Sequence, residues 1–244
     1  MSRVVWAITG SGSFLRELTE LFIKFKNTCS DLEIAVVLSR AGKEVSRIYG
    51  VLSKLQQVAS RTRYGGFYTD DGPAAWLPIL GRVSLRRYDS VIVAPATSNT
   101  VAKIVHGIAD TLITALVSQA LKSGTPIVVL PSDYAEESVT QLPCRVDVNN
   151  CTKCYECLKV GFCPYRAIIL SGEYPAVDYS RCWGCSECVL KCPSGTIKCW
   201  EEVIIRSSKI DLENVFKLKT IKGIYVVCNV AEVAELLRKY IMKH

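Results

Sequence analysis

CTKCYECLKVGFCP, residues 151–164, and CWGCSECVLKCP, residues 182–193, form an internal repeat with a period of about thirty residues. Each copy has a Cys-x-x-Cys-x-x-Cys run and a later cysteine followed by proline. Eight of the 12 cysteines of the chain lie in these two copies. Thiols clustered so tightly predict a metal site in a reducing compartment. The repeat therefore predicts a small metal-binding module.

The spacing favours iron–sulfur clusters. A four-iron four-sulfur cubane needs four thiolates at the corners of a tetrahedron, and a tight Cys-x-x-Cys-x-x-Cys loop supplies three. In bacterial-type ferredoxins with two clusters, the fourth comes from the Cys-Pro of the other copy. We therefore expect two [4Fe-4S] clusters. The predicted ligands are Cys151, Cys154, Cys157 and Cys192 for the first cluster, and Cys182, Cys185, Cys188 and Cys163 for the second.

One departure from the usual spacing and one alternative metal bear on this prediction. Five residues precede Cys163 where three are usual, which lengthens one loop and still permits ligation. Zinc is the alternative metal, but it prefers sites built from Cys-x-x-Cys pairs. Outside the repeat, Cys228 and Cys29 are expected to be structural. Cys144 and Cys199 flank the repeat and would be ligands only in a rearranged scheme.

Apolar runs alternate with helix-spaced segments before the repeat. Expected strands are residues 4–8, 34–38, 91–94 and 126–130, the third stopped by Pro95. A helix with Phe14, Leu18 and Phe22 on one face follows the first strand, with Ser13 as a plausible N-cap. Residues 61–82 are rich in Gly, Pro and aromatic residues and look irregular. The pattern predicts a parallel sheet covered by helices on both faces.

The same pattern returns after Trp200. We expect a strand at 201–206, a helix at 211–218, a strand at 224–228 and a last helix from Asn229. The cysteine module therefore looks inserted into the α/β domain. The predicted division is an α/β domain over residues 1–143, a two-cluster ferredoxin domain over 144–199, and a return to the α/β domain over 200–244.

The charge and hydrophobicity of the chain argue against nucleic-acid and membrane partners. The formal net charge is +7, but each cluster with its thiolates brings about two negative charges and a bound phosphate about two more. Basic residues are scattered, so we expect no nucleic-acid partner. No run of eighteen apolar residues suggests a membrane span, and the start MSRVVWAITGSGSF reads as a strand rather than a signal peptide. We expect a cytoplasmic protein.

Two loops of the α/β domain are candidates for ligand binding. Thr9-Gly10-Ser11-Gly12-Ser13 lies between a strand and a helix, where free backbone N–H groups favour an anion such as phosphate. A tight turn without a ligand explains this loop equally well. The second loop is Ala94-Pro95-Ala96-Thr97-Ser98-Asn99-Thr100, followed by Lys103 and Gly107-Ile108-Ala109-Asp110.

The second loop and its helix resemble the homo-oligomeric flavin-containing family that includes the phosphopantothenoylcysteine decarboxylases. The resemblance covers about residues 1–135, and it implies a flavodoxin-like, Rossmann-like sheet with FMN bound between subunits, usually of a trimer. Carried over by position, the residues that would contact FMN are Gly10, Ser11, Gly12, Ser13, Ser39, Pro95, Ala96, Thr97, Ser98, Asn99 and Thr100.

One departure bears on the reaction. The decarboxylases of this family have a histidine ahead of the Asn-Thr loop, whereas this chain has only His106 and His244. Decarboxylation is therefore not expected. A flavin domain with an inserted two-cluster ferredoxin resembles the acceptor-type dihydromethanopterin reductases and related archaeoflavoproteins. No catalytic residue is identified.

Two functions remain open. In the first, a ferredoxin or another one-electron donor reduces the clusters, these reduce FMN, and FMN reduces a dihydropterin, because a flavin accepts electrons singly and releases a hydride. Aromatic residues of 61–82 could stack on the pterin: Tyr64, Phe67, Tyr68 and Trp76. In the second, the protein relays electrons between carriers without a small-molecule substrate. A flavin prenyltransferase-like activity ranks below both, because it has no use for two clusters.

Overall fold

The structure, a computed structural model, describes residues 2–241, so His244 lies outside the described residues. The strands are β1 (Ser2–Ile8), β2 (Leu32–Leu38), β3 (Gly66–Thr69), β4 (Ser90–Ala96), β5 (Ile127–Pro131), β6 (Glu137–Gln141), β7 (Arg145–Val146), β8 (Ile168–Ser171), β9 (Tyr174–Val177), β10 (Ile197–Lys198), β11 (Glu202–Arg206) and β12 (Ile224–Val226). The helices are α1 (Leu15–Thr28), α2 (Arg40–Ile48), α3 (Leu52–Val58), α4 (Pro73–Ser84), α5 (Ser98–Val105), α6 (Leu112–Ser123), the 3-10 helix η1 (Glu156–Leu158), α7 (Glu187–Lys191), α8 (Lys209–Lys219) and α9 (Val230–Ile241).

Six strands form one parallel sheet in the order β12-β5-β4-β1-β2-β3. The predicted flavodoxin-like, Rossmann-like sheet is therefore confirmed. The chain leaves β1 toward β2 on one side and later returns to β4 on the other side. Loops diverge at this point of the sheet, and α/β folds of this kind bind ligands there, beyond the carboxyl ends of the strands.

Side chains of β1 alternate between two hydrophobic cores. Val4, Trp6 and Ile8 pack with α1, α3 and α9 on one face. Val5 and Ala7 pack with α4, α5, α6 and α8 on the other face. All five are fully buried, as the two-residue period of a strand with helices on both sides requires.

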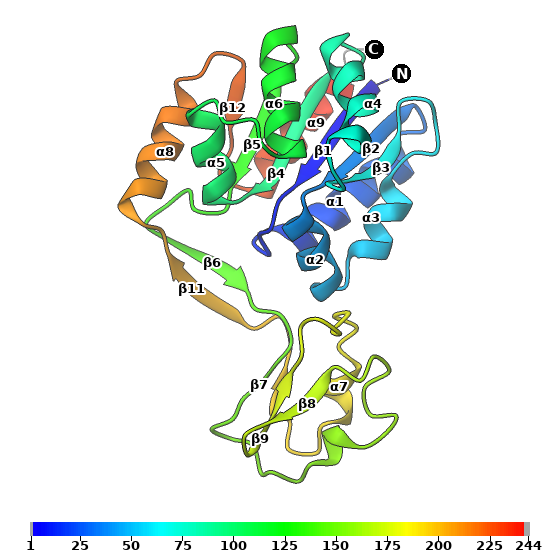
Figure 1. The fold of residues 1–244 in the computed structure, drawn as a ribbon, viewed down its shortest axis with the longest axis vertical. Helices are drawn as coiled ribbons and strands as arrows, with labels where there is room; N and C mark the ends of the chain where they lie inside the picture. The colour runs from blue at the N-terminus through cyan, green and yellow to red at the C-terminus, as the bar shows by residue number, and fades with distance from the viewer. Residues whose placement is uncertain (1, 242–244) are drawn as a thin grey trace.

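The predicted ferredoxin domain is inserted between β5 and β12 of this sheet. The chain leaves along β6, returns along β11, and these two strands pair antiparallel as a narrow ribbon. Figure 1 shows the ribbon linking the α/β domain to a smaller domain that holds β7 to β10 and α7. Within residues 2–241, no helix combines the length and the apolar character needed to cross a membrane.

The structure corrects several local expectations. Residues 61–82 are not irregular, because they contain β3 and most of α4, which starts at Pro73 and holds Pro78 inside it. The strand β4 continues through Pro95, whose peptide bond with Ala94 is cis, to Ala96. Ser13 is not the N-cap of α1; Phe14 holds that position in a left-handed conformation. The strand at 202–206 pairs with β6, which was not anticipated, and lies outside the main sheet.

Candidate functional site

A cleft of about 670 Å³ opens beyond the carboxyl ends of β1, β2 and β4. Its size is within the range of pockets that bind small molecules and cofactors. The lining residues are Thr9, Gly10, Ser39, Arg40, Ala41, Asp70, Gly72, Pro73, Trp76, Thr97, Asn99, Thr100, Lys103, Asp110, Thr111 and Ile113. The cleft thus gathers both loops that the sequence indicated.

Four helix N-termini border this cleft: that of α4, at Gly72 and Pro73, and those of α2, α5 and α6, which have side-chain caps. The hydroxyl of Ser39 caps α2 by accepting a hydrogen bond from the N–H of Gly42 at 2.9 Å. Thr97 caps α5 through Thr100, and Thr111 caps α6 through Thr114. The positive ends of the helix dipoles favour an anionic ligand here, whereas the charged side chains of the lining balance one another: Arg40 and Lys103 against Asp70 and Asp110.

The Thr9 hydroxyl joins the two loops. It donates a hydrogen bond to the carbonyl of Pro95 and accepts one from the N–H of Thr97, both at 2.8 Å. Gly10, the next residue, leaves no room for a side chain, because an added Cβ would lie 2.6 Å from the Cβ of Ala41. The loop therefore lies directly against the first turn of α2, and its backbone is open to the cleft.

The predicted FMN-contacting residues fall into two groups. Those that line the cleft are Gly10, Ser39, Thr97, Asn99 and Thr100. Those that lie outside its lining are Ser11, Gly12, Ser13, Pro95, Ala96 and Ser98. Ser13 instead shares a hydrogen bond with Thr140 at 3.0 Å, and a Cβ on Gly12 would lie 2.0 Å from the Tyr49 hydroxyl. The second half of the first loop thus faces the ribbon rather than the cleft.

Trp76 on α4 has an unsatisfied polar atom at the cleft. Its indole nitrogen is buried and has no hydrogen-bond partner. The other three aromatic residues proposed to stack on a pterin do not line the cleft: Tyr64 lies under Arg3, Phe67 packs on the core, and Tyr68 contacts Arg82. A buried N–H without a partner is costly, so this atom indicates a place for a ligand acceptor.

An ion pair closes another side of the cleft. The Lys103 ammonium lies 2.9 and 2.8 Å from the two carboxylate oxygens of Asp110, and this hydrogen bond holds the pKa of Asp110 below its usual range. His106, at the end of α5, is exposed and does not line the cleft. Sequence reasoning missed Arg40, Asp70 and Gly72, although each directly follows a strand end or begins a helix, the positions that line such clefts.

The first predicted set of cluster ligands is close together in the structure. Burial raises the pKa of Cys157, and charge repulsion from the rest of its set raises it further: Cys154, Cys192 and Cys151. Cys192 differs from its partners. Burial alone would raise its pKa, but hydrogen bonds from Ser194, Thr196 and the backbone lower it to about 7.

The second predicted set is close together as well. Burial raises the pKa of Cys188 to about 11, and repulsion from its set adds to the effect: Cys185, Cys182 and Cys163. The members of this set also line one small apolar cavity. Thiols that repel one another when ionised suit a cation-rich cluster, which compensates the charge of four thiolates. Both sets fit the pairing expected from the repeat.

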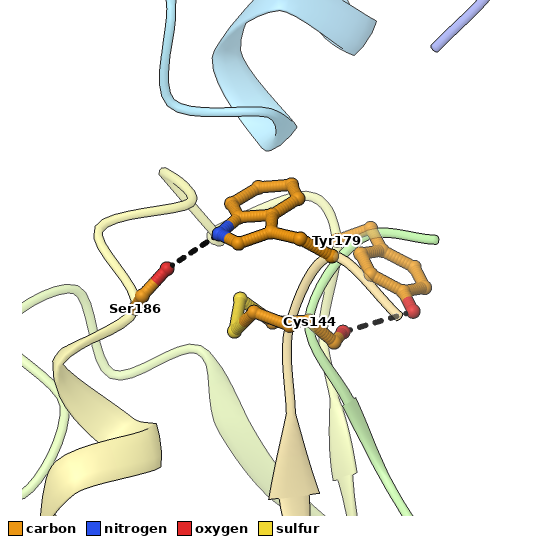
Figure 2. The surroundings of a disulfide bond; sticks show 5 residues. Cys144, Tyr179 and Ser186 are labelled. Atoms are coloured by element: carbon orange, nitrogen blue, oxygen red, sulfur yellow. Dashed lines mark hydrogen bonds between the residues drawn. A yellow bond between two sulfur atoms is a disulfide. The ribbon is translucent and has the colours of Figure 1, made fainter. Parts of the chain in front are cut away.

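Cys144 and Cys199 form a disulfide. The expectation that they might act as ligands in a rearranged scheme is not supported, because both sulfurs are already bonded. The bond joins the first and last residues of the predicted insert. Figure 2 shows two hydrogen bonds beside it: the Tyr179 hydroxyl donates to the Cys144 carbonyl at 3.1 Å, and the Trp200 indole donates to Ser186 at 2.9 Å.

Family models match both parts of the chain. One described as Flavoprotein matches residues 1–142, and one described as 4Fe-4S binding domain matches residues 175–198. The latter span contains the second cysteine run and Cys192.

Curated relatives cover nearly the whole chain. Dihydromethanopterin reductase (acceptor) of Methanosarcina mazei is 36% identical over 236 residues, which are 96% of this chain and 98% of the relative. The protein of the same description from Methanocaldococcus jannaschii is 36% identical over 234 residues, 96% of this chain and 94% of the relative.

A solved structure has the same fold. Burkholderia xenovorans DmrB in complex with FMN, described as a cubic protein cage for redox transfer, matches with a TM-score of 0.62 and 24% identity, over 99% of this chain and 96% of that chain. The chain therefore belongs to the Flavoprotein family and, with its inserted 4Fe-4S ferredoxin domain, is an iron–sulfur flavoprotein of the oxidoreductase class.

Proposed function

We propose that the chain passes electrons from a one-electron donor, such as a ferredoxin, through two [4Fe-4S] clusters to FMN and on to a dihydropterin, reducing dihydromethanopterin to tetrahydromethanopterin. The proposal is carried by the similarity to a reductase of this description, which is 36% identical over 96% of this chain. The chain also has the two features that such a reaction needs, a cleft bordered by helix N-termini and two cysteine quartets.

FMN would occupy the cleft beyond β1, β2 and β4. When bound, it supplies the conversion between single electrons and a hydride. Gly10 and Ser39 present backbone and hydroxyl groups for the phosphate and ribityl chain, and Thr97, Asn99 and Thr100 line the rest. Of the remaining predicted FMN residues, Pro95 holds the two loops together through its carbonyl, which accepts a hydrogen bond from the Thr9 hydroxyl. Trp76 lines the cleft, and its indole N–H has no hydrogen-bond partner in the protein.

The clusters would use all eight cysteines of the repeat. Cys151, Cys154, Cys157 and Cys192 hold one, and Cys163, Cys182, Cys185 and Cys188 hold the other. The proposal keeps the division at 1–143, 144–199 and 200–244. We also propose the cytoplasm as the compartment.

The proposal includes a homo-oligomer built on trimers. Large apolar side chains of the α/β domain are exposed in the single chain and support a further contact surface: Leu77, Leu85, Ile210 and Phe216 are each at least 67% exposed. DmrB, which has the same fold, is described as a cubic protein cage, and this description also supports assembly of several chains.

The test uses anaerobically purified protein with its cofactors. Iron and flavin quantitation is expected to give about eight irons and one FMN per chain. The reduced protein is then mixed with dihydromethanopterin or with buffer, and flavin absorbance is followed. Reoxidation faster than in buffer supports the reductase. If the flavin is reoxidised by an oxidised ferredoxin and not by dihydromethanopterin, the result supports the relay function instead. If the protein contains zinc in place of iron, both the reductase and the relay function are refuted.

A further inference from the structure

Helix α2 extends from the flavin cleft to the ferredoxin domain. Ser39, Arg40 and Ala41 at its beginning line the cleft. Arg47, near its end, contacts the ferredoxin domain. Nine residues of α-helix span about 13 Å. In Figure 1, α2 lies on the side of the α/β domain that faces the smaller domain.

The guanidinium of Arg47 is the centre of this contact. Its side chain is only 11% exposed. Nη1 donates a hydrogen bond to the carbonyl of Cys182, and Nη2 donates to the carbonyl of Tyr179 at 2.8 Å. The carboxylate of Glu44, which is 61% exposed, pairs with the same group at 2.7 Å. A planar fork of donors suits two carbonyls of one loop, and lysine could not reproduce it fully.

Two glycines bring the main chains together beside this arginine. A Cβ on Gly50 would lie 2.6 Å from the carbonyl oxygen of Gly184, and a Cβ on Gly184 would lie 2.3 Å from that of Ile48. Gly184 lies inside the run Cys182–Cys188. The second ligand set is therefore held directly against the end of α2.

The loop of the first ligand set has contacts of another kind. Lys153 pairs with Glu173 at 2.7 Å, and the Tyr155 hydroxyl donates to the Glu173 carbonyl at 3.3 Å. Glu173, the partner in both contacts, belongs to the ferredoxin domain itself. The two ligand sets thus have different surroundings, and a buried cation of the α/β domain contacts the second.

We propose that Arg47 is a positioning residue that holds the Cys163/Cys182/Cys185/Cys188 set against the flavin domain, and that its charge raises the reduction potential of the cluster on that set alone. Reduction adds one negative charge to a cluster, and a nearby cation in a buried setting stabilises the reduced form. The inference deepens the proposed function and rests on it, because it requires a cluster on each set and assigns the second to the flavin-facing position.

The test is a redox titration of the complete protein, with the clusters followed by electron paramagnetic resonance. Arg47→Met is expected to lower the potential of one cluster and leave the other unchanged. Arg47→Lys keeps the charge and is expected to restore most of the difference. Ser194→Ala identifies the first cluster, because Ser194 lies 3.6 Å from the sulfur of Cys192 and its loss is expected to shift only that signal.

A second variant keeps the test decisive if Arg47→Met does not fold. Glu44→Gln removes the partly exposed counter-charge and leaves Arg47 in place, so the same cluster is expected to shift to a higher potential. Unchanged potentials in both variants, or a shift of the signal that Ser194→Ala identifies, would overturn the inference. If iron quantitation shows a single cluster, the proposed two-cluster function is wrong. If it shows two clusters and the potentials do not change as expected, only the role of Arg47 is wrong.

Discussion

Gly10 shows how a single residue sets the shape of the cleft. Its loop lies so close to α2 that an added methyl group would overlap the Ala41 side chain at 2.6 Å. The glycine pattern of this loop was visible in the sequence. The sequence did not reveal that Gly12 faces Tyr49 and the ribbon, because Tyr49 is in turn held by a hydrogen bond to the Gln141 carbonyl, 92 residues further along the chain.

Replacing Gly10 with alanine is expected to lower affinity for FMN and to destabilise the protein by roughly 1–3 kcal/mol, because one of the two segments must move. Flavin titration and thermal unfolding measure the two effects. Gly81→Ala in α4 is the matched control, since a Cβ there has no atom within 4 Å. Equal FMN affinity in the parent and the Gly10 variant would contradict the proposed binding site.

Trp76→Phe tests the unsatisfied indole N–H. The ring volume is largely kept, and the parent atom has no partner in the protein. We expect little loss of stability without ligand, and a loss of about 1 kcal/mol in binding, or roughly fivefold in Kd, for the molecule that accepts this hydrogen bond. Separate titrations with FMN and with the dihydropterin show which one it is. A fall in stability without any change in binding would assign Trp76 to packing alone.

Tyr88 is expected to contribute a pH dependence to stability. Burial, with a smaller effect from Tyr68, raises its pKa to about 12. A tyrosine in the unfolded chain titrates near pH 10. The folded state therefore holds the proton more tightly, and this contribution is complete below pH 10 and is lost as the pH rises toward 12.

Tyr88→Phe should flatten the fall in unfolding temperature between about pH 10 and pH 12. The substitution also removes the 2.9 Å hydrogen bond to the Tyr64 carbonyl, so the free energy of unfolding near pH 8 is expected to fall by about 1 kcal/mol. Tyr225→Phe serves as the control, because Tyr225 is 52% exposed. Identical alkaline profiles for the parent and the Tyr88 variant would contradict the argument.

At the scale of elements, the strands that could be predicted from the sequence are mainly those buried on both faces. β1, β2, β4 and β5 are buried on both faces, and their continuous apolar runs identified them. β11 was predicted from its run Val203-Ile204-Ile205, whereas β6 was missed because Val139 is its one apolar residue. Backbone pairing between distant segments holds the ribbon together, and local sequence does not reveal such a partner. α4 was missed because Pro73 and Pro78 are usually read as helix breakers.

The disulfide at the end of the ribbon is expected to stabilise the ferredoxin domain. It closes a loop with a sequence separation of 55 residues, for which chain-entropy arguments give roughly 4 kcal/mol. The double variant Cys144→Ser, Cys199→Ser should lose its cluster absorbance at a lower guanidinium concentration than the parent. Cys29→Ser, outside both ligand sets, controls for the loss of a thiol. Equal midpoints, or two free thiols at these positions in the isolated protein, would refute this prediction.

At the scale of the whole molecule, the single chain exposes apolar side chains on the α/β domain. Phe216 is 71% exposed and Leu77 is 69% exposed. If these lie at subunit contacts, the native mass is expected to be a multiple of three times 27.0 kDa, measurable by light scattering. Phe216→Glu would then give smaller species, whereas Lys222→Glu, an exposed charge change, would not. A monomer at micromolar concentration would contradict the trimer-based assembly.

The order of strands has a consequence for synthesis of the protein. β12 is the edge strand beside β5, yet it is translated after the whole ferredoxin domain. Because a growing chain emerges from its N-terminus, every cysteine of the two quartets leaves the ribosome while the edge at β5 is still open. The predicted cluster ligands are therefore synthesised before the last strand and α9 complete the α/β domain.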